Sequence, residues 1–330
     1  MPPRGLRPGA DRRLVSHFDS TKMRVEQITS GKNPKIKQLL LLQEKSKARR
    51  EQGLFVVEGR RELEHCLEAG YTVKTIFVCP EILKASDPDS AENYFLCSSS
   101  KNQFSATSFL RHPTHAEASA GADSAEYYFS EGFQKNQFSA ANIIEIPEQL
   151  YRKVAYREGT EGIIAEVEYK SLKLDDLRLP ENPLVMVLES VEKPGNLGAV
   201  LRSADAAGAD AVLICDPLTD LYNPNLIRAS IGAVFTVPTV ACTSEEAIAF
   251  LQAKGIQILT AQLQDSSLYY DVDMRRGTAL VMGTEATGLT DQWRQAASAH
   301  IRIPMLGRLD SLNVSVSAAI LLFEAVRQRQ

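Results

Sequence analysis

The segment LVMVLESVEKPGNLGAVLRSADAAGADAVLIC, residues 184–215, decides the fold of this 330-residue chain. Its two ends, 184–189 and 210–215, are short continuous apolar runs, which are typical of buried strands. Between them lie a loop with two glycines and the helical stretch 199–208. A strand, a helix and a second strand at this spacing predict a parallel pair of strands covered by a helix.

The same alternation continues to residue 330. Three further β-rich apolar runs follow, at 256–262, 278–283 and 299–304, and helical stretches lie between them. Continuous apolar strands that alternate with helices indicate a parallel sheet with both faces covered. We therefore expect an α/β domain over residues 184–330, preceded by a polar, proline-containing linker over residues 171–183.

The N-terminal part predicts a second, smaller α/β domain over residues 23–170. A capped helix with a basic extension follows Ile28 and ends at a glycine. Short strands and helices come after it, at 54–59 (strand), 60–70 (helix), 72–79 (strand), 142–147 (strand) and 162–169 (strand). Residues 1–22 combine proline, glycine and charge with no apolar period, so they predict a disordered tail.

Residues 84–140 interrupt this pattern with an internal repeat. The sequence AENYFLCSSSKNQFSA (91–106) returns as AEYYFSEGFQKNQFSA (125–140), with ten of 16 positions identical. The offset of 34 residues is also that of tetratricopeptide repeats, but two copies without paired amphipathic helices do not make such an array. We interpret the repeat as a local duplication inside a loop or helix, and the sequence does not give its role.

Composition narrows the class of protein. Apolar residues make up 44% and charged residues 24% of the chain, as in ordinary globular proteins. No run reaches the roughly 18–20 apolar residues of a membrane helix, and the N-terminus lacks the apolar core of a signal peptide. Five scattered cysteines without C-x-x-C spacing argue against a disulfide framework and a zinc site. We expect a cytoplasmic protein with no membrane or metal partner.

Charge is distributed unevenly along the chain. Residues 1–60 carry 14 Lys and Arg against 6 Asp and Glu, whereas residues 61–330 carry 23 against 35. A basic N-terminal part on an acidic body indicates an anionic partner such as a nucleic acid. The alternative is that these side chains simply form solvated helix faces.

The first of three chemistry-bearing loops follows the strand at 184–189. Gly195 and Gly198 permit a tight turn there, with a helix expected from about Ala199. Asn196 and Arg202 are six residues apart, so we expect both to reach one pocket. A dinucleotide-binding loop is the alternative, with Asp216 at the end of the next strand as the ribose ligand, but the G-x-x-G spacing differs from G-x-G-x-x-G.

Two further loops follow later strands. In MGTEATGL (282–289), Gly283 ends a strand and lets the backbone approach a ligand, while Glu285 pairs with a cation or caps a helix. The loop IPMLGRLDSLNVSVS (303–317) offers an apolar wall and backbone donors, which suit an adenosine-like ligand. Its alternative is an ordinary βα loop in which Asn313 is a buried, satisfied polar residue.

Together, in this order, the loops resemble the three signature motifs of the SpoU/TrmH-type RNA 2′-O-ribose methyltransferases of the SPOUT superfamily. The matching motifs are Asn196-x-Gly198-x-x-x-Arg202, Met282-Gly-Thr-Glu285-x-x-Gly288-Leu289, and Ile303-Pro-Met305 through Ser311-Leu-Asn313-Val-Ser315. The segment 223–235 also resembles the family. NPKIKQLL, FVVEGRRELE and YREGTEGIIAEV resemble its substrate-binding domain, so the likeness covers about residues 24–330 except 84–140.

The resemblance implies a fold, a cofactor and partners. The fold is a C-terminal parallel α/β domain with a deep trefoil knot, preceded by a small α/β RNA-binding domain similar to ribosomal-protein-like folds. The partners are RNA and a second copy of the chain in a homodimer. The cofactor is S-adenosylmethionine (SAM), and the motifs place it against Gly283, Ile303, Met305, Ser311 and Leu312.

The resemblance also implies methyl transfer from SAM to a ribose 2′-oxygen. The accessory first domain favours ribosomal RNA over transfer RNA, while the target nucleotide does not follow from the sequence. The family assigns activation of the 2′-hydroxyl to Arg202. Because arginine is almost never deprotonated, we expect Arg202 to bind the adjacent phosphate and orient the hydroxyl. Asn196, Glu285 and Asn313 would position Arg202 and the ribose.

Four basic residues are expected to contact RNA: Arg228, Lys32, Lys35 and Arg60. Plainer roles stay open for three site residues: Arg202 as a salt-bridge residue, Glu285 as a helix cap and Arg228 as a structural residue. Two other functions are also considered. One is an RNA-binding or ribosome-assembly protein that has lost catalysis, which the retained motif residues disfavour. The other is a nicotinamide oxidoreductase, which the glycine spacing disfavours.

Overall fold

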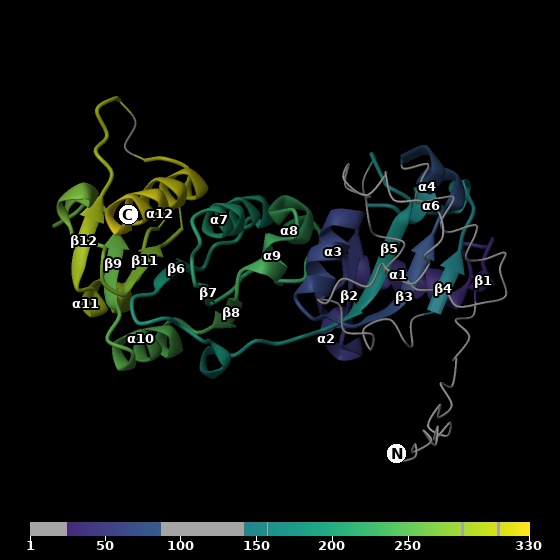
Figure 1. The fold of residues 1–330 in the computed structure, drawn as a ribbon, viewed down its shortest axis with the longest axis horizontal. Helices are drawn as coiled ribbons and strands as arrows, with labels where there is room; N and C mark the ends of the chain where they lie inside the picture. Colours follow the sequence, from purple (N-terminus) through teal and green to yellow (C-terminus); the bar gives the residue numbers. More distant parts are fainter. Residues whose placement is uncertain (1–24, 87–141, 157, 285–286, 309–310) are drawn as a thin grey trace, which may run out of the picture.

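The computed structural model describes residues 25–86, 142–156, 158–284, 287–308 and 311–330. Figure 1 shows two sheets side by side along the long axis, each with its own helices. The tail 1–22 and both copies of the repeat lie outside the described residues. The expected domain and linker boundaries remain predictions.

The N-terminal sheet has five strands in the order β1-β4-β3-β5-β2. These strands are β1 (Val25–Gln27), β2 (Leu54–Glu58), β3 (Val73–Val78), β4 (Asn142–Glu145) and β5 (Ile163–Glu168). Strand β5 runs antiparallel to β2 and β3, whereas β4 is parallel to β1 and β3. The helices around this sheet are α1 (Pro34–Glu44), α2 (Ser46–Gln52), α3 (Arg60–Glu68), α4 (Pro80–Ser86) and α6 (Glu148–Val154).

Local sequence explains the first two helices. The Asn33 side chain accepts a hydrogen bond from the Lys35 amide at 2.9 Å, and Pro34 occupies the first turn of α1, where its missing N–H costs nothing. The basic extension forms a separate helix, α2, which ends at Gly53 with φ 63°. Glycine adopts this left-handed conformation without strain.

The C-terminal sheet has seven strands in the order β10-β12-β9-β11-β6-β7-β8, and every pair is parallel. The strands are β6 (Leu184–Glu189), β7 (Ala211–Cys215), β8 (Thr239–Cys242), β9 (Gln257–Ala261), β10 (Ser267–Leu268), β11 (Thr278–Met282) and β12 (Ala299–Arg302). The central strands β6, β7 and β11 are buried along their whole length, because helices cover both faces. The predicted parallel α/β sheet is confirmed, while the trefoil knot remains a prediction.

Its helices are α7 (Pro194–Ala206), α8 (Pro224–Ser230), α9 (Ala233–Thr236), α10 (Ser244–Ala253), α11 (Asp291–Ala296) and α12 (Val314–Arg329), with short 3₁₀ turns at Leu174–Asp176 and Tyr269–Asp271. Helix α7 begins at Pro194, so the expectation of a glycine turn before Ala199 is wrong. Proline fits the first helical turn, and Gly198 serves packing inside the helix. A Cβ on Gly198 would lie 2.5 Å from the Ala229 Cβ on α8.

A buried seam joins the two sheets. The Arg49 guanidinium of α2 lies 2.7 Å from the Asp220 carboxylate of the loop after β7, and the two side chains are only 2% and 5% exposed. Beside this ion pair, the Phe55 ring stacks on Tyr222 with a centroid distance of 4.2 Å. The Tyr71 and Tyr222 hydroxyls are 3.0 Å apart. Charge, aromatic packing and hydrogen bonding therefore hold the two parts together.

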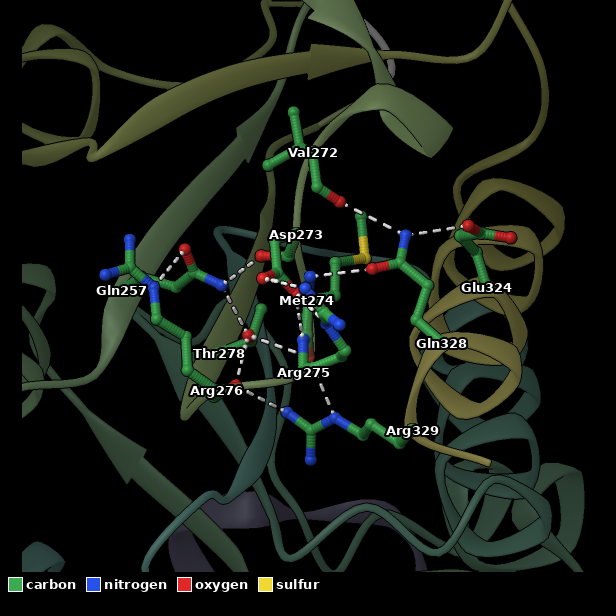
Figure 2. A network of polar contacts seen from close by, with 10 residues as sticks. All are labelled: Gln257, Val272, Asp273, Met274, Arg275, Arg276, Thr278, Glu324, Gln328 and Arg329. Carbon is green, nitrogen blue, oxygen red and sulfur yellow. Dashed lines mark hydrogen bonds and ion pairs between the residues drawn. The ribbon is translucent and has the colours of Figure 1, made fainter.

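The last turn of α12 is fixed to the amino end of the sheet (Figure 2). The Gln328 amide accepts from the Met274 N–H at 2.8 Å and donates to the Val272 carbonyl at 3.1 Å. The Arg329 guanidinium donates to the carbonyls of Met274 and Arg276, each at 2.9 Å. Partial burial lowers the pKa of Arg329. These contacts fix the end of α12, which starts at Val314 near the opposite, carboxyl end of the sheet.

Candidate active site

A cavity of about 400 Å³ opens at the carboxyl end of the C-terminal sheet. Ligands of open parallel sheets bind at this end, because the loops that follow the strands meet there. The lining comes from the segments after β9, β11 and β12 and from the start of α12. Its members include Gln262, Leu263, Gly283, Thr284, Gly288, Leu289, Arg294, Arg302, Ile303, Met305, Ser311, Leu312 and Val314. All five residues expected to hold the cofactor are among them.

Gly283 lets two stretches of backbone approach each other. A Cβ at this position would lie 2.6 Å from the Leu289 amide and closer still to the Gly288 carbonyl. The turn between them is closed by hydrogen bonds from the Gly288 amide to the Thr284 carbonyl and from the Thr287 amide to the Thr284 hydroxyl, both 3.0 Å. The close approach that Gly283 permits is therefore between two backbone segments of one loop, Gly283 on one side and Gly288 and Leu289 on the other. This loop forms one wall of the cavity.

The structure brings Asn196 and Asn313 together, although they are 117 residues apart. The Asn313 Nδ2 donates to the Asn196 Oδ1 at 3.1 Å. The Asn313 Oδ1 caps α12 by accepting from the Ser315 amide at 3.0 Å. One asparagine therefore orders the start of α12 and ties it to the first turn of α7. It is an exposed capping residue, so the alternative of a buried polar residue does not apply.

Arg202 lies apart from this pair of asparagines. Both Asn196 and Arg202 belong to the continuous helix α7, and six residues along a helix are about 9 Å apart along the axis and about 120° apart around it. Both residues are thus carried by one helix and not by a loop, and their convergence on one pocket remains a prediction. The Arg202 side chain is exposed, does not line the cavity, and has no hydrogen bond or ion pair with any described residue. It is available to an anionic ligand.

Two other residues that the sequence suggested for a site, Glu285 and Asp216, have different outcomes. Glu285 lies outside the described residues, so its role remains a prediction. Asp216, the ribose ligand of the alternative dinucleotide site, caps α10: its carboxylate accepts from the Ser244 hydroxyl at 2.6 Å and from the Ser244 amide at 3.3 Å. This engagement argues against the nicotinamide function.

Residues 183–323 match the SpoU rRNA methylase family, and residues 33–118 match the MRM3-like substrate-binding domain. The 23S rRNA (guanosine-2′-O-)-methyltransferase RlmB of Pseudomonas putida is 36% identical over 184 residues, which are 53% of this chain and 74% of that protein. The chain belongs to the SpoU rRNA methylase family. This confirms the family indicated by the three motifs.

Two solved structures match nearly the whole length of this chain. A crystal structure of an RNA 2′-O ribose methyltransferase, 34% identical, superposes with a TM-score of 0.68 over 92% of this chain and 99% of that one. The AdoMet-bound rRNA methyltransferase of Sinorhizobium meliloti is 26% identical, with a TM-score of 0.70 over 92% and 98%. The 23S rRNA (guanosine(2553)-2′-O)-methyltransferase RlmP of Bacillus subtilis is 27% identical over 91% of this chain and 98% of its own.

The cavity of this SpoU methylase fits SAM in size and chemistry. Its volume lies within the range of about 300–1,000 Å³ that small-molecule pockets span. Ile303, Met305 and Leu312 contribute apolar residues to its lining, which suit a nucleoside. Arg294 and Arg302 also line the cavity, and the Arg294 guanidinium lies 3.6 Å from the Asp291 carboxylate.

The expected RNA-binding residues have different environments. Lys32 and Arg228 are exposed, and Lys35 is half-exposed and pairs with Glu26. Arg60 is only 7% exposed, and the Glu161 carboxylate accepts from its amide at 2.6 Å. A buried arginine cannot reach a phosphate in solution, so Arg60 is removed from the proposed RNA contacts. Arg49, in the basic extension, is also buried, because its guanidinium is paired with Asp220 in the seam.

No described helix is long and apolar enough to cross a membrane. In the described part of the chain, no three His, Cys, Asp or Glu side chains gather in a way that could hold a metal ion. Sequence reasoning missed one constellation at this end of the sheet, the contacts of the buried Glu189 with Ser244 and Thr290. The available signal was a single acidic residue at the end of an otherwise apolar strand.

Proposed function

We propose that the protein is a SAM-dependent methyltransferase that methylates a ribose 2′-oxygen in ribosomal RNA. The carrying observation is the cavity at the carboxyl end of the parallel sheet, whose walls come from the second and third family motifs. Leu312 and Val314, on either side of Asn313, belong to its lining, and Asn313 donates to Asn196. RlmB and RlmP, both named as 23S rRNA methyltransferases, support ribosomal RNA as the substrate.

Each part of the site has a separate task. Backbone groups near Gly283 and Ile303 would hold the adenine, and Met305 and Leu312 would cover it. Bound SAM supplies an electrophilic methyl group. A ribose hydroxyl is a poor nucleophile until its proton is removed or strongly polarised. Arg202 would bind the neighbouring phosphate and orient the 2′-hydroxyl. As the new C–O bond forms and the S–CH₃ bond breaks, the hydroxyl proton would pass to water and S-adenosylhomocysteine would leave.

The protein acts as a cytoplasmic homodimer. Support comes from α12, which exposes Val316 and Phe323 at 48% each. These residues are seven apart and share one helix face, because seven residues make two turns. A second copy of the chain would cover this apolar face. Sedimentation at micromolar concentration tests the dimer, and Phe323→Glu should shift it toward monomer.

The function itself is tested by two measurements on the full chain. Calorimetry should detect SAM binding, and radiolabelled methyl transfer should be greater to ribosomal RNA than to transfer RNA. Mapping ribose methylation in total RNA with and without the gene then identifies the nucleotide. A protein that binds ribosomal RNA but neither binds SAM nor transfers methyl would instead be an RNA-binding or ribosome-assembly factor.

RNA binding should depend strongly on salt. Exposed Lys45, Lys47 and Arg50 continue the basic surface of α1 and α2. Each neutralised phosphate releases counterions, so replacing these three residues by Gln should reduce the slope of log K against log salt by about 0.7–0.9 for every phosphate that is no longer neutralised. Arg49→Gln is left out, because it would break the buried seam. An unchanged slope in a salt titration would mean that this surface is merely solvated.

A further inference from the structure

Glu189 is a buried acid at the end of β6, seven residues before Asn196, the first residue of the first family motif. Its side chain is 2% exposed. One carboxylate oxygen accepts from the Thr290 amide at 2.9 Å, and the other accepts from the Thr290 hydroxyl at 2.6 Å. The second oxygen also faces the Ser244 hydroxyl at 3.4 Å. Burying a carboxylate is costly unless such donors satisfy it, so these contacts are what keep Glu189 in place.

The partner of Glu189 belongs to the cavity wall. Thr290 immediately follows Gly288 and Leu289, which line the cavity, and it is the N-cap of α11. Helix α11 in turn carries Arg294 into the lining. The Thr290 side chain does not cap α11 itself, since its hydroxyl is directed to Glu189. The carboxylate therefore fixes the point at which the loop after β11 turns into α11.

A second anchor holds the same helix. The fully buried Trp293 donates its indole N–H to the Ser244 hydroxyl at 2.9 Å. Ser244 is the residue that also faces Glu189 and donates to Asp216. One buried polar network therefore joins the ends of β6 and β7 to the starts of α10 and α11. Glu189 is the member of this network that contacts Thr290.

Glu189 also begins the segment that carries the first motif. The next residue, Ser190, has φ 51°, a left-handed conformation that non-glycine residues seldom adopt. The chain turns there toward α7, which presents Asn196 and Arg202. A shift of the Glu189 carboxylate would therefore move two parts of the site. One is the cavity wall next to Thr290, and the other is α7, which carries Asn196 and Arg202.

We infer that Glu189 is a positioning residue for methyl transfer: through Thr290 it sets the geometry of the cofactor cavity relative to α7, without touching either substrate. The inference rests on the proposed function. It predicts that loss of the hydrogen bonds from Thr290 to the Glu189 side chain weakens SAM binding and also slows transfer when SAM is saturating. A residue with only a role in folding would lower the Tm and leave both quantities unchanged in the folded protein.

The test compares four variants well below the Tm of each. Glu189→Ala should raise the Kd for SAM by roughly tenfold and lower kcat by a similar factor, since a displacement of about 1 Å at a catalytic site can cost 10²-fold. Glu189→Gln should restore most of both, because its amide oxygen can accept from the Thr290 N–H while its NH₂ donates to the Thr290 hydroxyl. Thr290→Val, which keeps the shape but removes the hydroxyl, should raise the Kd for SAM by a smaller factor.

Asp216→Asn is the matched control. It neutralises the other carboxylate of the same network, whose hydrogen bonds go to Ser244 on α10 and not to the cavity wall. Asp216 has φ 48°, which asparagine also tolerates. This variant should keep the SAM Kd and kcat of the wild type even if its Tm falls.

The outcomes separate the inference from the proposed function. If the wild type fails to bind SAM, the proposed function is wrong. If the wild type binds SAM and Glu189→Ala binds it equally well, the positioning role alone is overturned. Equal weakening by Asp216→Asn and Glu189→Ala would also overturn it, because the network would then act only through general stability. Should Glu189→Ala not fold, Thr290→Val decides by the same Kd measurement.

Discussion

Arg202→Ala should reduce the single-turnover rate of methyl transfer by roughly 10³-fold, the effect typical of removing a group that stabilises a transition state electrostatically. Its affinity for SAM should stay near that of the wild type. The reason is geometric: Arg202 is exposed on α7, whereas the cofactor cavity is built from the segments after β9, β11 and β12. Rapid-quench kinetics and calorimetry measure the two quantities separately.

Two further variants sharpen this result. Arg202→Lys keeps the charge but loses the planar fork that holds a phosphate with two hydrogen bonds, so its rate should fall between those of the wild type and Arg202→Ala. Arg275→Ala serves as the control, because Arg275 is an equally exposed arginine that pairs with Asp273 away from the cavity. If Arg202→Ala lowered SAM affinity and rate in proportion, the separation of tasks between α7 and the cavity would be wrong.

Gly283→Ala should disturb the cofactor cavity more than a methyl group added at any other position. The new Cβ would lie 2.6 Å from the Leu289 amide and closer still to the Gly288 carbonyl, and both are backbone atoms that cannot rotate away. Overpacking of this kind costs typically about 1–3 kcal/mol of stability. Since the displaced loop lines the cavity, the Kd for SAM should rise by roughly 10²-fold. Thermal unfolding and calorimetry provide the two readouts.

Gly195→Ala is the matched substitution. A Cβ on Gly195 would meet no heavy atom within 4 Å, and the residue lies in the first turn of α7. Alanine is favoured over glycine in a helix by up to about 1 kcal/mol, so this variant should be as stable as the wild type or slightly more so. Unchanged SAM affinity in Gly283→Ala would show that the turn from Thr284 to Gly288 does not bound the cofactor site.

The sequence was most informative where the chain obeys local rules. Strands β6, β7 and β11 consist almost entirely of apolar residues, and such runs are buried in a parallel sheet whatever their neighbours are. Asn33 followed by Pro34 marks the start of α1 by capping chemistry alone. The three motif loops could be placed near a common site for the same reason, because each follows a strand of one parallel sheet.

Long-range partners set what could not be predicted. The sequence does not distinguish Arg49 from the other basic residues of α2, because its burial depends on Asp220, which lies 171 residues away in the chain. Gly198 resembles a turn glycine until α8 is seen to press against it. Strand β8 has only four residues and is half-exposed at the sheet edge, so its pattern is too weak to recognise. Glu189 needed the position of Thr290, 101 residues later, to acquire a role.

The buried seam between the two sheets has a consequence for target choice. Breaking a buried ion pair such as Arg49–Asp220 by removing one partner costs roughly 3–5 kcal/mol, and the stacked Phe55 and Tyr222 rings add to that resistance. The N-terminal sheet and the cavity are therefore held at a fixed distance from each other. We therefore expect an RNA bound by the N-terminal part to present to the cavity only the ribose that lies at this distance, so that the target nucleotide is selected by distance as well as by chemistry.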